Sequence, residues 1–440
     1  MVTNNLVEHI LETTYEDIPD RVIEHGKKSL LNWLGVTIGA AQHKSIDILL
    51  EVSNSLGTSQ QVSIFGRSIK TDLLTAVLVN GTASHVFDFD DTHLETIHHP
   101  SGPVAPVALA LGEKFDLSTK EILRAFVLGC EAELRIANSV YPSHYRNGFH
   151  ITSSTGVFGA AIAAGILLKL SKEKMAMALG LAGTQSFGLR EMFGTMTKPF
   201  HAGKAAQNGL YAAMLVEKGF TSSSQVLEAK RGFANVYSTS HNLGRINERW
   251  GKVWEFENNT FKPFACGIVL HPSIDACIQF SEYASPDEVE EIRLRVHPYV
   301  HELTSKENPK TGLEGKFSIY HTGAIAFLEK GASENQFQDE RVNAGEVVQF
   351  RKKIKPMADE QIDKDKVVAT LVLKDGTTKK LVIDHAIGSL QNPLTTEMLA
   401  SKFMNLSSPI IGEESSKQVI EKIMKLEKLD YIHPVIEAID

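Results

Sequence analysis

The stretch GVFGAAIAAGILL, residues 156–168, is the longest apolar run of the chain. It is shorter than the roughly 20 apolar residues that span a bilayer. Its glycines and alanines are typical of a buried helix in close contact with its neighbours. Apolar residues at three-and-four spacing predict a series of helices around it, over residues 18–38, 73–87, 119–137, 155–170, 172–183 and 203–217. Ser118 and Ser171 stand where N-caps are expected.

The pattern changes after about His271. Alternating apolar residues predict a strand over 291–296, and KDGT at 374–377 predicts a hairpin within 366–384. Helices are expected between these strands, over 320–329 and 338–350, and helical spacing returns from Thr395. The sequence therefore predicts a mainly α fold, with a large helical domain (1–268 with 395–440) and a smaller inserted α+β domain (269–394).

Bulk properties narrow the class of protein. A chain of 440 residues is long enough for two domains. The net charge is -8 and no Lys/Arg-rich run is present, so the sequence does not indicate a basic surface that would bind nucleic acid or an anionic membrane. A small-molecule partner is expected instead. The three cysteines do not suggest a disulfide framework, and the N-terminus lacks the pattern of a secretory signal. We expect a cytoplasmic protein.

The segment NGTASHVFDFDDTHLETIHHPSGP, residues 80–103, holds four carboxylates and four histidines around a helix-breaking His-Pro-Ser-Gly. Buried acids and imidazoles destabilise a fold unless they are paired, so they usually persist where chemistry requires them. We interpret residues 88–102 as an active-site segment. The alternative is that these acids only cap a helix and pair with nearby cations.

Metal sites in this segment match known patterns poorly. The segment does not match a calcium-binding loop, because His93 occupies the position at which glycine is required. A magnesium site of the isoprenoid-synthase type, using Asp90, Asp91 and Glu95, lacks its second acidic motif. A site built from His93, His98 and His99 would lie on irregular backbone rather than at helical spacing.

Three further polar loops precede apolar helices, at 144–156, 194–204 and 261–272. They carry His150, then Lys198, then Lys262 with Cys266 and His271. Helix N-termini attract carboxylates. No GxGxxG, P-loop or GxSxG motif is present, so nucleotide cofactors and acyl-enzyme chemistry have no support.

Taken together, these motifs resemble the MmgE/PrpD family, which contains 2-methylcitrate dehydratases, cis-aconitate decarboxylases and an iminodisuccinate epimerase. The resemblance is carried by DFDDTHLETIHHPSG (88–102), GFHITSSTGVFGAA (148–161), GTMTKPFHAGKAAQNG (194–209), FKPFACGIVLHPSID (261–275) and FSIY (317–320). It implies a large helical domain, a smaller inserted α+β domain, a homodimer, and an active site between the domains that uses no metal or organic cofactor.

The resemblance also implies a set of site residues by matched motif: Asp88, Thr92, His99, His150, Lys198, Lys262 and Tyr320. Cys266 and His271 are further candidates for substrate binding. Cys266 departs from the pattern of animal-type cis-aconitate decarboxylases, which carry a histidine there.

The chemistry of this set suits small polycarboxylates. Lys198 and Lys262 can neutralise carboxylates, and Thr92 can orient one. We hypothesise that His99 is the general acid/base, oriented by Asp88 and assisted by His150 and Tyr320. We expect a lyase that acts on a small tricarboxylate, with decarboxylation of cis-aconitate ahead of dehydration of 2-methylcitrate and with epimerisation of iminodisuccinate as the alternative. Outside the family, a magnesium-dependent isoprenoid synthase and a non-catalytic helical interaction protein stay open.

Overall fold

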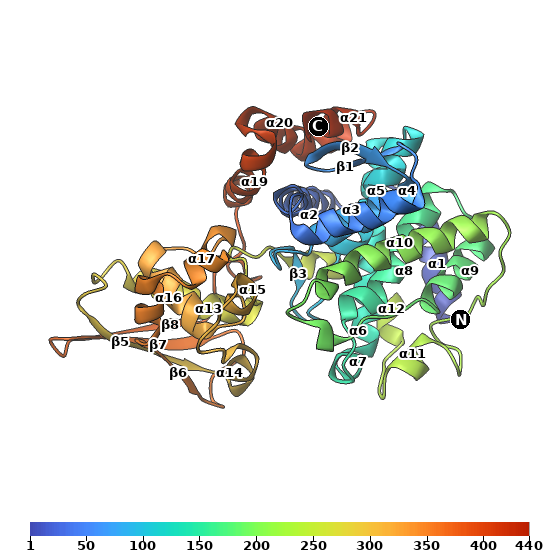
Figure 1. The fold of residues 1–440 in the computed structure, drawn as a ribbon. Coiled ribbons are helices and arrows are strands. Elements are labelled where there is room, and N and C mark those ends of the chain that lie inside the picture. Colours follow the sequence, from blue (N-terminus) through green and yellow to red (C-terminus); the bar gives the residue numbers. More distant parts are fainter. Residues whose placement is uncertain (440) are drawn as a thin grey trace. The chain divides into compact units, whose positions relative to one another are not determined.

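The computed structural model describes residues 1–439, which form two compact units. The large unit comprises Met1–Val86, Asp90–Thr260 and the C-terminal segment from Thr395, and the small unit comprises Phe87–Phe89 and Phe261–Leu394. Helices dominate the chain (Figure 1), which confirms the predicted mainly α fold class.

The large unit consists of helices with two short strand pairs. Its helices are α1 (Val2–Glu12), α2 (Asp20–Gly39), α3 (Lys44–Leu56), α4 (Leu73–Ala83), α5 (Ser101–Phe115), α6 (Thr119–Val140), α7 (Ser143–Arg146), α8 (Ile151–Leu167), α9 (Lys172–Gly183), α10 (Thr197–Glu217), α11 (Phe233–Tyr237), α12 (Gly244–Asn247), α19 (Thr396–Ile411), α20 (Glu413–Met424) and α21 (His433–Ile439). Its antiparallel strand pairs are β1 (Val62–Ile64) with β2 (Arg67–Thr71), and β3 (Thr92–His93) with β4 (Asn259–Thr260).

Helix α8, which contains the long apolar run, forms the centre of the large unit. All its residues are buried, and it packs against α5, α6, α9 and α10. Glycine permits the contact with α6, because a Cβ atom on Gly159 would lie 2.9 Å from the carbonyl oxygen of Gly129. A Cβ on Gly81 of α4 would likewise lie 2.7 Å from the Cα of Gly203 on α10. The prediction of a buried helix in close contact with its neighbours is confirmed.

The predicted caps are confirmed, whereas several predicted helix bounds are wrong. The Ser118 and Ser171 side chains accept hydrogen bonds from backbone N–H groups of α6 and α9. The helix expected over 73–87 ends at Ala83, so the residues after it are released into a turn. The helix expected from residue 203 already begins at Thr197, which places Lys198 in its first turn.

The small unit contains a four-stranded sheet in the order β6-β5-β7-β8, with β5 and β6 parallel and the other pairs antiparallel. The strands are β5 (Val289–Val296), β6 (Ile354–Ala358), β7 (Val367–Leu373) and β8 (Thr378–Ile383), and the helices are α13 (His271–Phe280), α14 (Pro298–Thr304), α15 (Gly312–Gly315), α16 (Ile319–Glu329), α17 (Asp339–Val342) and α18 (Gly345–Arg351). The predicted hairpin is confirmed as β7–β8, with Gly376 at φ +87° in its turn.

Helices α13 and α16 pack on this sheet. The helix predicted over 338–350 is instead two short helices, because Ala344 takes an extended conformation between them. In the large unit, α19 packs on α2, and Lys402 Nζ donates to Asn32 Oδ1 at 2.7 Å. Within residues 1–439, none of the helices has the length and apolar character that a membrane span requires.

Candidate active site

The acidic, histidine-rich segment connects α4 to α5 on irregular backbone. Asp88 and Ile97 both adopt left-handed conformations, with φ of +51° and +58°, so the chain turns sharply at each. Between these turns, β3 pairs with β4, and the His93 N–H donates to the His98 carbonyl at 2.8 Å. The turns return the chain on itself and bring histidines from both ends of the segment together.

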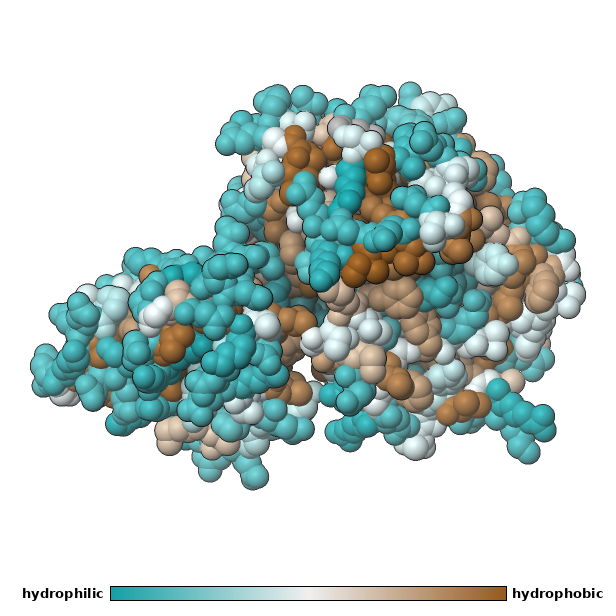
Figure 2. Space-filling model, in the orientation of Figure 1, coloured by the Kyte–Doolittle hydropathy of each residue, from teal (hydrophilic) through white to brown (hydrophobic). Residues whose placement is uncertain are grey.

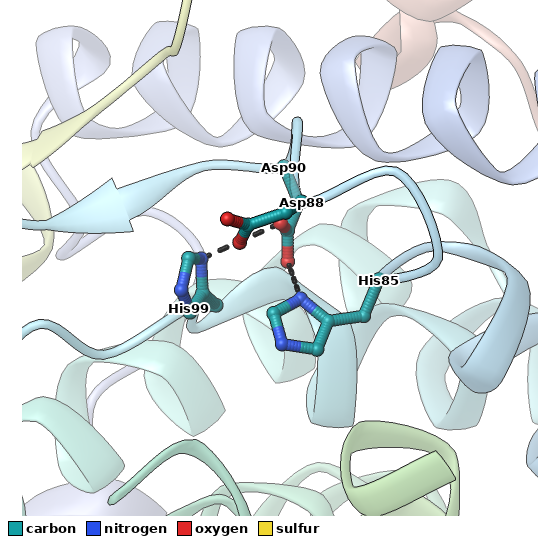
Figure 3. A group of neighbouring side chains, drawn as sticks. All are labelled: His85, Asp88, Asp90 and His99. Carbon is teal, nitrogen blue, oxygen red and sulfur yellow. Dashed lines mark hydrogen bonds and ion pairs between the residues drawn. The ribbon is translucent and has the colours of Figure 1, made fainter. Parts of the chain in front are cut away.

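Asp90 lies between two imidazoles in the large unit (Figure 3). Its Oδ2 is 2.7 Å from His85 Nδ1, and its Oδ1 is 3.4 Å from His99 Nδ1. All three side chains are buried, and the two rings lie 4.6 Å apart between centroids. A carboxylate in this position stabilises a positive charge on either ring.

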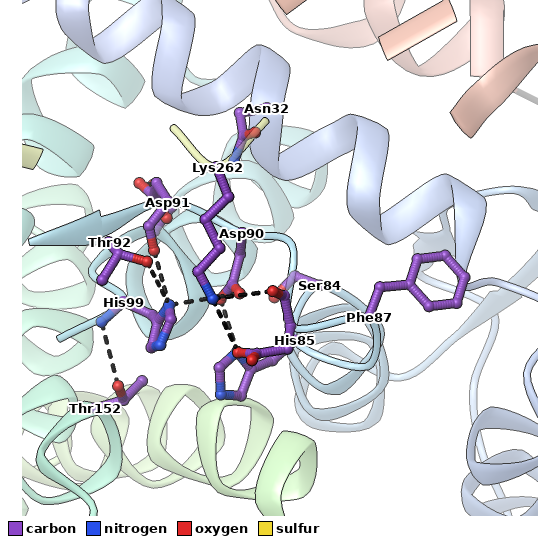
Figure 4. Close-up of polar contacts among 12 residues, drawn as sticks. Asn32, Ser84, His85, Phe87, Asp90, Asp91, Thr92, His99, Thr152 and Lys262 are labelled. Atoms are coloured by element: carbon purple, nitrogen blue, oxygen red, sulfur yellow. Dashed lines mark hydrogen bonds and ion pairs between the residues drawn. The ribbon is translucent and has the colours of Figure 1, made fainter. Parts of the chain in front are cut away.

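His99 is held through Nδ1 (Figure 4). This nitrogen lies 2.8 Å from the carbonyl oxygen of Asp91 and 3.2 Å from Thr92 Oγ1. Because a carbonyl oxygen can only accept, Nδ1 is the donor, and the neutral ring then carries its lone pair on Nε2. Protons exchanged with a ligand therefore pass through Nε2.

Asp88 has a partner that the sequence did not predict. In the small unit, Lys262 Nζ donates to the Asp88 carbonyl at 2.9 Å and to its Oδ1 at 3.1 Å, and both side chains are buried. Asp88 is thus a partner of Lys262. Within the large unit, Asp90, Asp91 and Thr92 contact His99 Nδ1. The contact of Asp90 with His99 was not predicted, because the sequence does not distinguish Asp90 from the neighbouring carboxylates.

His150 and His201 form a second imidazole pair in the large unit, with their Nδ1 atoms 3.0 Å apart. Burial, with His85 and Lys198 as smaller causes, holds the pKa of His150 well below its ordinary value. Burial also lowers the pKa of His201 to about 4. The pair is therefore neutral near pH 7, and one ring donates to the other. His201 belongs to the third motif, but nothing in its spacing marked it as a partner of His150.

Lys198 lies in the first turn of α10 and is buried, with its Nζ 5.5 Å from the centre of the Phe193 ring. A buried ammonium group at the start of a helix suits an anionic ligand. This position is consistent with the predicted carboxylate-binding role of Lys198.

His85, Asp90 and His99 are close enough to share a metal ion, with ligand atoms within 4.8 Å of one another. A nitrogen that donates a hydrogen bond cannot also ligate a metal, and His99 Nδ1 donates to Asp91. If His99 served as a metal ligand, it would therefore do so through Nε2, the nitrogen that carries the lone pair.

The metal sites considered from the sequence do not fit the structure. Glu95 is exposed and pairs with Arg245 at 3.0 Å, away from the buried Asp90 and Asp91. His93 Nδ1 bonds to Thr96 Oγ1 at 2.8 Å, and His98 faces Glu133. Among the described residues, neither the acids Asp90, Asp91 and Glu95 nor the histidines His93, His98 and His99 form a group that could hold a metal ion.

Asp91 is a buried carboxyl with an unusual pKa. It accepts hydrogen bonds from Ser101 Oγ and, at 2.6 Å, from Asn259 Nδ2. Burial outweighs these bonds and raises the pKa of Asp91 to about 7. Because the folded pKa is raised, the proton on Asp91 stabilises the fold at low pH, and this contribution is lost as pH rises toward 7.

Replacing Asp91 by Asn is expected to remove this pH dependence, since the amide keeps an acceptor oxygen and cannot ionise. Relative to the variant, the wild type should lose stability between about pH 4 and pH 7, the range between the unfolded and folded pKa values of Asp91. Thermal melts across this range test the expectation, with the exposed Asp287→Asn as control. A wild-type minus Asp91→Asn difference in Tm that does not change with pH would contradict it.

The remaining predicted residues lie in the small unit. Cys266 is fully buried, and burial raises the pKa of its thiol to about 12, so it cannot act as an acid/base near neutral pH. His271 begins α13, with its ring edge-on to Phe264 at 5.3 Å. Tyr320 lies in the first turn of α16 and lines a pocket with Arg351. Burial and Glu307 raise the pKa of Tyr320, so the phenol keeps its proton.

Comparison with known proteins agrees with this arrangement of motifs. Residues 4–245 match the MmgE/PrpD N-terminal domain, and residues 264–427 match the MmgE/PrpD C-terminal domain. Cis-aconitate decarboxylase of Mus musculus is 28% identical over 98% of this chain and 91% of its own length. The Homo sapiens protein of that name is 27% identical over 94% and 89%, and that of Aspergillus terreus is 24% identical over 97% and 93%. The chain belongs to the MmgE/PrpD family.

Proposed function

We propose that this protein is a carboxy-lyase that converts cis-aconitate to itaconate and CO2 without a metal or organic cofactor. The observation that carries the proposal is His99, fixed through Nδ1 and flanked by the buried Asp90. The relatives that match almost the whole chain are named cis-aconitate decarboxylases, which supports this substrate over others of the family.

The geometry of His99 suits the proton step of such a reaction. When the bond to a carboxylate breaks, CO2 leaves and its electron pair stays on the carbon skeleton, where a proton must capture it. Asp90 stabilises the imidazolium form of His99, which delivers that proton from Nε2. Thr92 contacts His99 Nδ1 at 3.2 Å, so we assign it to positioning the ring as well as to its predicted contact with substrate.

Cations and neutral donors complete the proposed roles. Lys198 and Lys262 are each proposed to neutralise a substrate carboxylate, which lowers the energy of the negative charge that develops. His150 and Tyr320, both kept in the form that is neutral at pH 7, donate hydrogen bonds without adding charge. Cys266 and His271 are proposed to shape the substrate pocket rather than to exchange protons.

A proton NMR time course of the full chain with cis-aconitate tests the proposal. The olefinic methylene signals of itaconate should appear while cis-aconitate disappears. Silence with cis-aconitate, combined with dehydration of 2-methylcitrate or epimerisation of iminodisuccinate, would move the assignment to that reaction within the family.

We further propose that the protein is a homodimer in solution. Helix α3 exposes Ile48, Val52 and Leu56 at 43%, 55% and 82%, and their four-residue spacing puts them on one face. Figure 2 shows apolar residues gathered over this part of the large unit. Contiguous exposed apolar surface marks an interaction site.

The cytoplasmic location stays a prediction from composition.

The double substitution Ile48→Glu and Val52→Glu is expected to yield a monomer, because it places two charges in the proposed interface. Light scattering coupled to size-exclusion chromatography measures the mass directly. Val236→Glu, at an exposed position of α11, serves as the control and should stay dimeric. A wild-type mass of one chain, or a double variant that stays dimeric, would contradict the proposal.

A further inference from the structure

The small unit contains a pocket of about 280 Å³ beside the first turn of α16. Its polar lining consists of Tyr320, Glu307, Arg351, Lys352 and Lys355, and Ile354 and Pro356 complete it. Three cations thus surround one carboxylate. This volume is near the lower end of ligand pockets, about 300 Å³, so the pocket suits a small molecule.

Arg351 is the buried cation of this pocket, with 5% of its surface exposed. Its guanidinium donates to the carbonyl oxygens of Val342 and Pro309 and lies 3.2 Å from His321 Nδ1. Burial lowers the pKa of His321 to about 4, so these partners are all uncharged. The Nε of Arg351 has no hydrogen-bond partner among residues 1–439.

Within the described residues, the other two cations, Lys352 and Lys355, also lack a carboxylate partner. Lys352 bonds to the neutral amide of Gln349 at 3.0 Å. Within the described part of the chain, neither lysine nor Arg351 forms an ion pair with a carboxylate. A buried charge is normally paired or bound to a counter-ion, because removing it from water is costly. Among the residues that line the pocket, only Arg351 is a buried cation, and its unpartnered Nε therefore calls for an anion, with the exposed Lys352 and Lys355 beside it.

We propose that this pocket is an anion site for a small di- or tricarboxylate, held by Arg351, Lys352 and Lys355. A guanidinium can bind a carboxylate through two parallel hydrogen bonds, and the Tyr320 hydroxyl offers a neutral donor. Inorganic phosphate presents similar oxygen atoms and is the alternative source of this chemistry. The site shares Tyr320 with the proposed active site, so in this respect it rests on the proposed function.

Calorimetric titration of the full chain with tricarballylate, and separately with inorganic phosphate, tests the site. The double substitution Lys352→Gln and Lys355→Gln changes two exposed lysines, so the fold should persist, which its Tm would verify. We expect loss of one bound tricarballylate per chain, or at least about tenfold weaker binding, because charge-assisted hydrogen bonds are lost.

Lys380→Gln, an exposed lysine of β8 outside the pocket, is the matched control and should bind like the wild type. Isotherms that are the same for the double variant and the control would overturn the proposal. Binding of phosphate but not tricarballylate would overturn the carboxylate assignment. Turnover of cis-aconitate, measured on the same samples, separates failure of this site from failure of the proposed enzyme activity.

Discussion

Replacing His99 by Gln is expected to lower kcat on cis-aconitate at least about 100-fold, the loss typical of a missing general acid/base. Gln can still donate to the Asp91 carbonyl, as His99 Nδ1 does at 2.8 Å, but it cannot carry a proton to carbon. The Tm should change little by comparison, because the shape and the main hydrogen bond are kept. Steady-state kinetics and thermal melts measure both quantities.

The exposed histidine His241 provides the matched control, since His241→Gln makes the same chemical change away from the site. That variant should keep wild-type turnover. Near-normal activity of His99→Gln would contradict the assignment of His99 as the general acid/base. Equal losses of activity and of folded protein would instead indicate a structural role.

Replacing Lys262 by Met should have the largest combined effect on stability and activity. Lys262 and Asp88 form a buried ion pair at 3.1 Å, and removal of one partner from such a pair costs about 3–5 kcal/mol. The same change removes a cation proposed to bind a substrate carboxylate. We expect a lower free energy of unfolding together with a strongly reduced kcat/KM.

A second substitution separates these two effects. In Lys262→Met with Asp88→Asn, no buried carboxylate is left without its cation, so most of the lost stability should return. Activity should not return, because the substrate-binding cation is still missing. Recovery of activity in the double variant would contradict the binding role of Lys262, and a stable Lys262→Met single variant would contradict the structural role of the pair.

Much of the fold was predictable because local patterns and long-range packing agree. The apolar run of α8 lacks a polar face, and its burial on all sides follows directly. The KDGT turn determines the β7–β8 hairpin through a glycine with positive φ. Helix ends were less predictable. Thr197 starts α10 ahead of Pro199, although the flanking glycine and proline suggested a loop.

The site was predictable in its motifs but not in its pairings. His99 and Lys262 were expected to bear chemistry, and the structure shows each in a buried polar contact. The left-handed turn at Asp88 helps to determine which of the adjacent acids contact His99. The residue types alone do not predict that turn. The partnership of His150 with His201 joins residues from α10 and the start of α8, so only the packing of these helices reveals it.

The pocket around Arg351 illustrates the same limit. Its cations come from the last residue of α18 and from the segment that leads into and begins β6, and in a sequence such lysines and arginines resemble an ordinary solvated cluster. Only the burial of Arg351, together with its uncharged partners, distinguishes it from such a cluster.

The most direct test of the account is a proton NMR time course with cis-aconitate and EDTA, run in parallel on the wild type and on His99→Gln. The account predicts itaconate from the wild type and at least about 100-fold less from the variant. A wild type that leaves cis-aconitate unchanged but turns over 2-methylcitrate or iminodisuccinate would contradict the proposed reaction. Itaconate formed equally fast by both proteins would contradict the proposed role of His99.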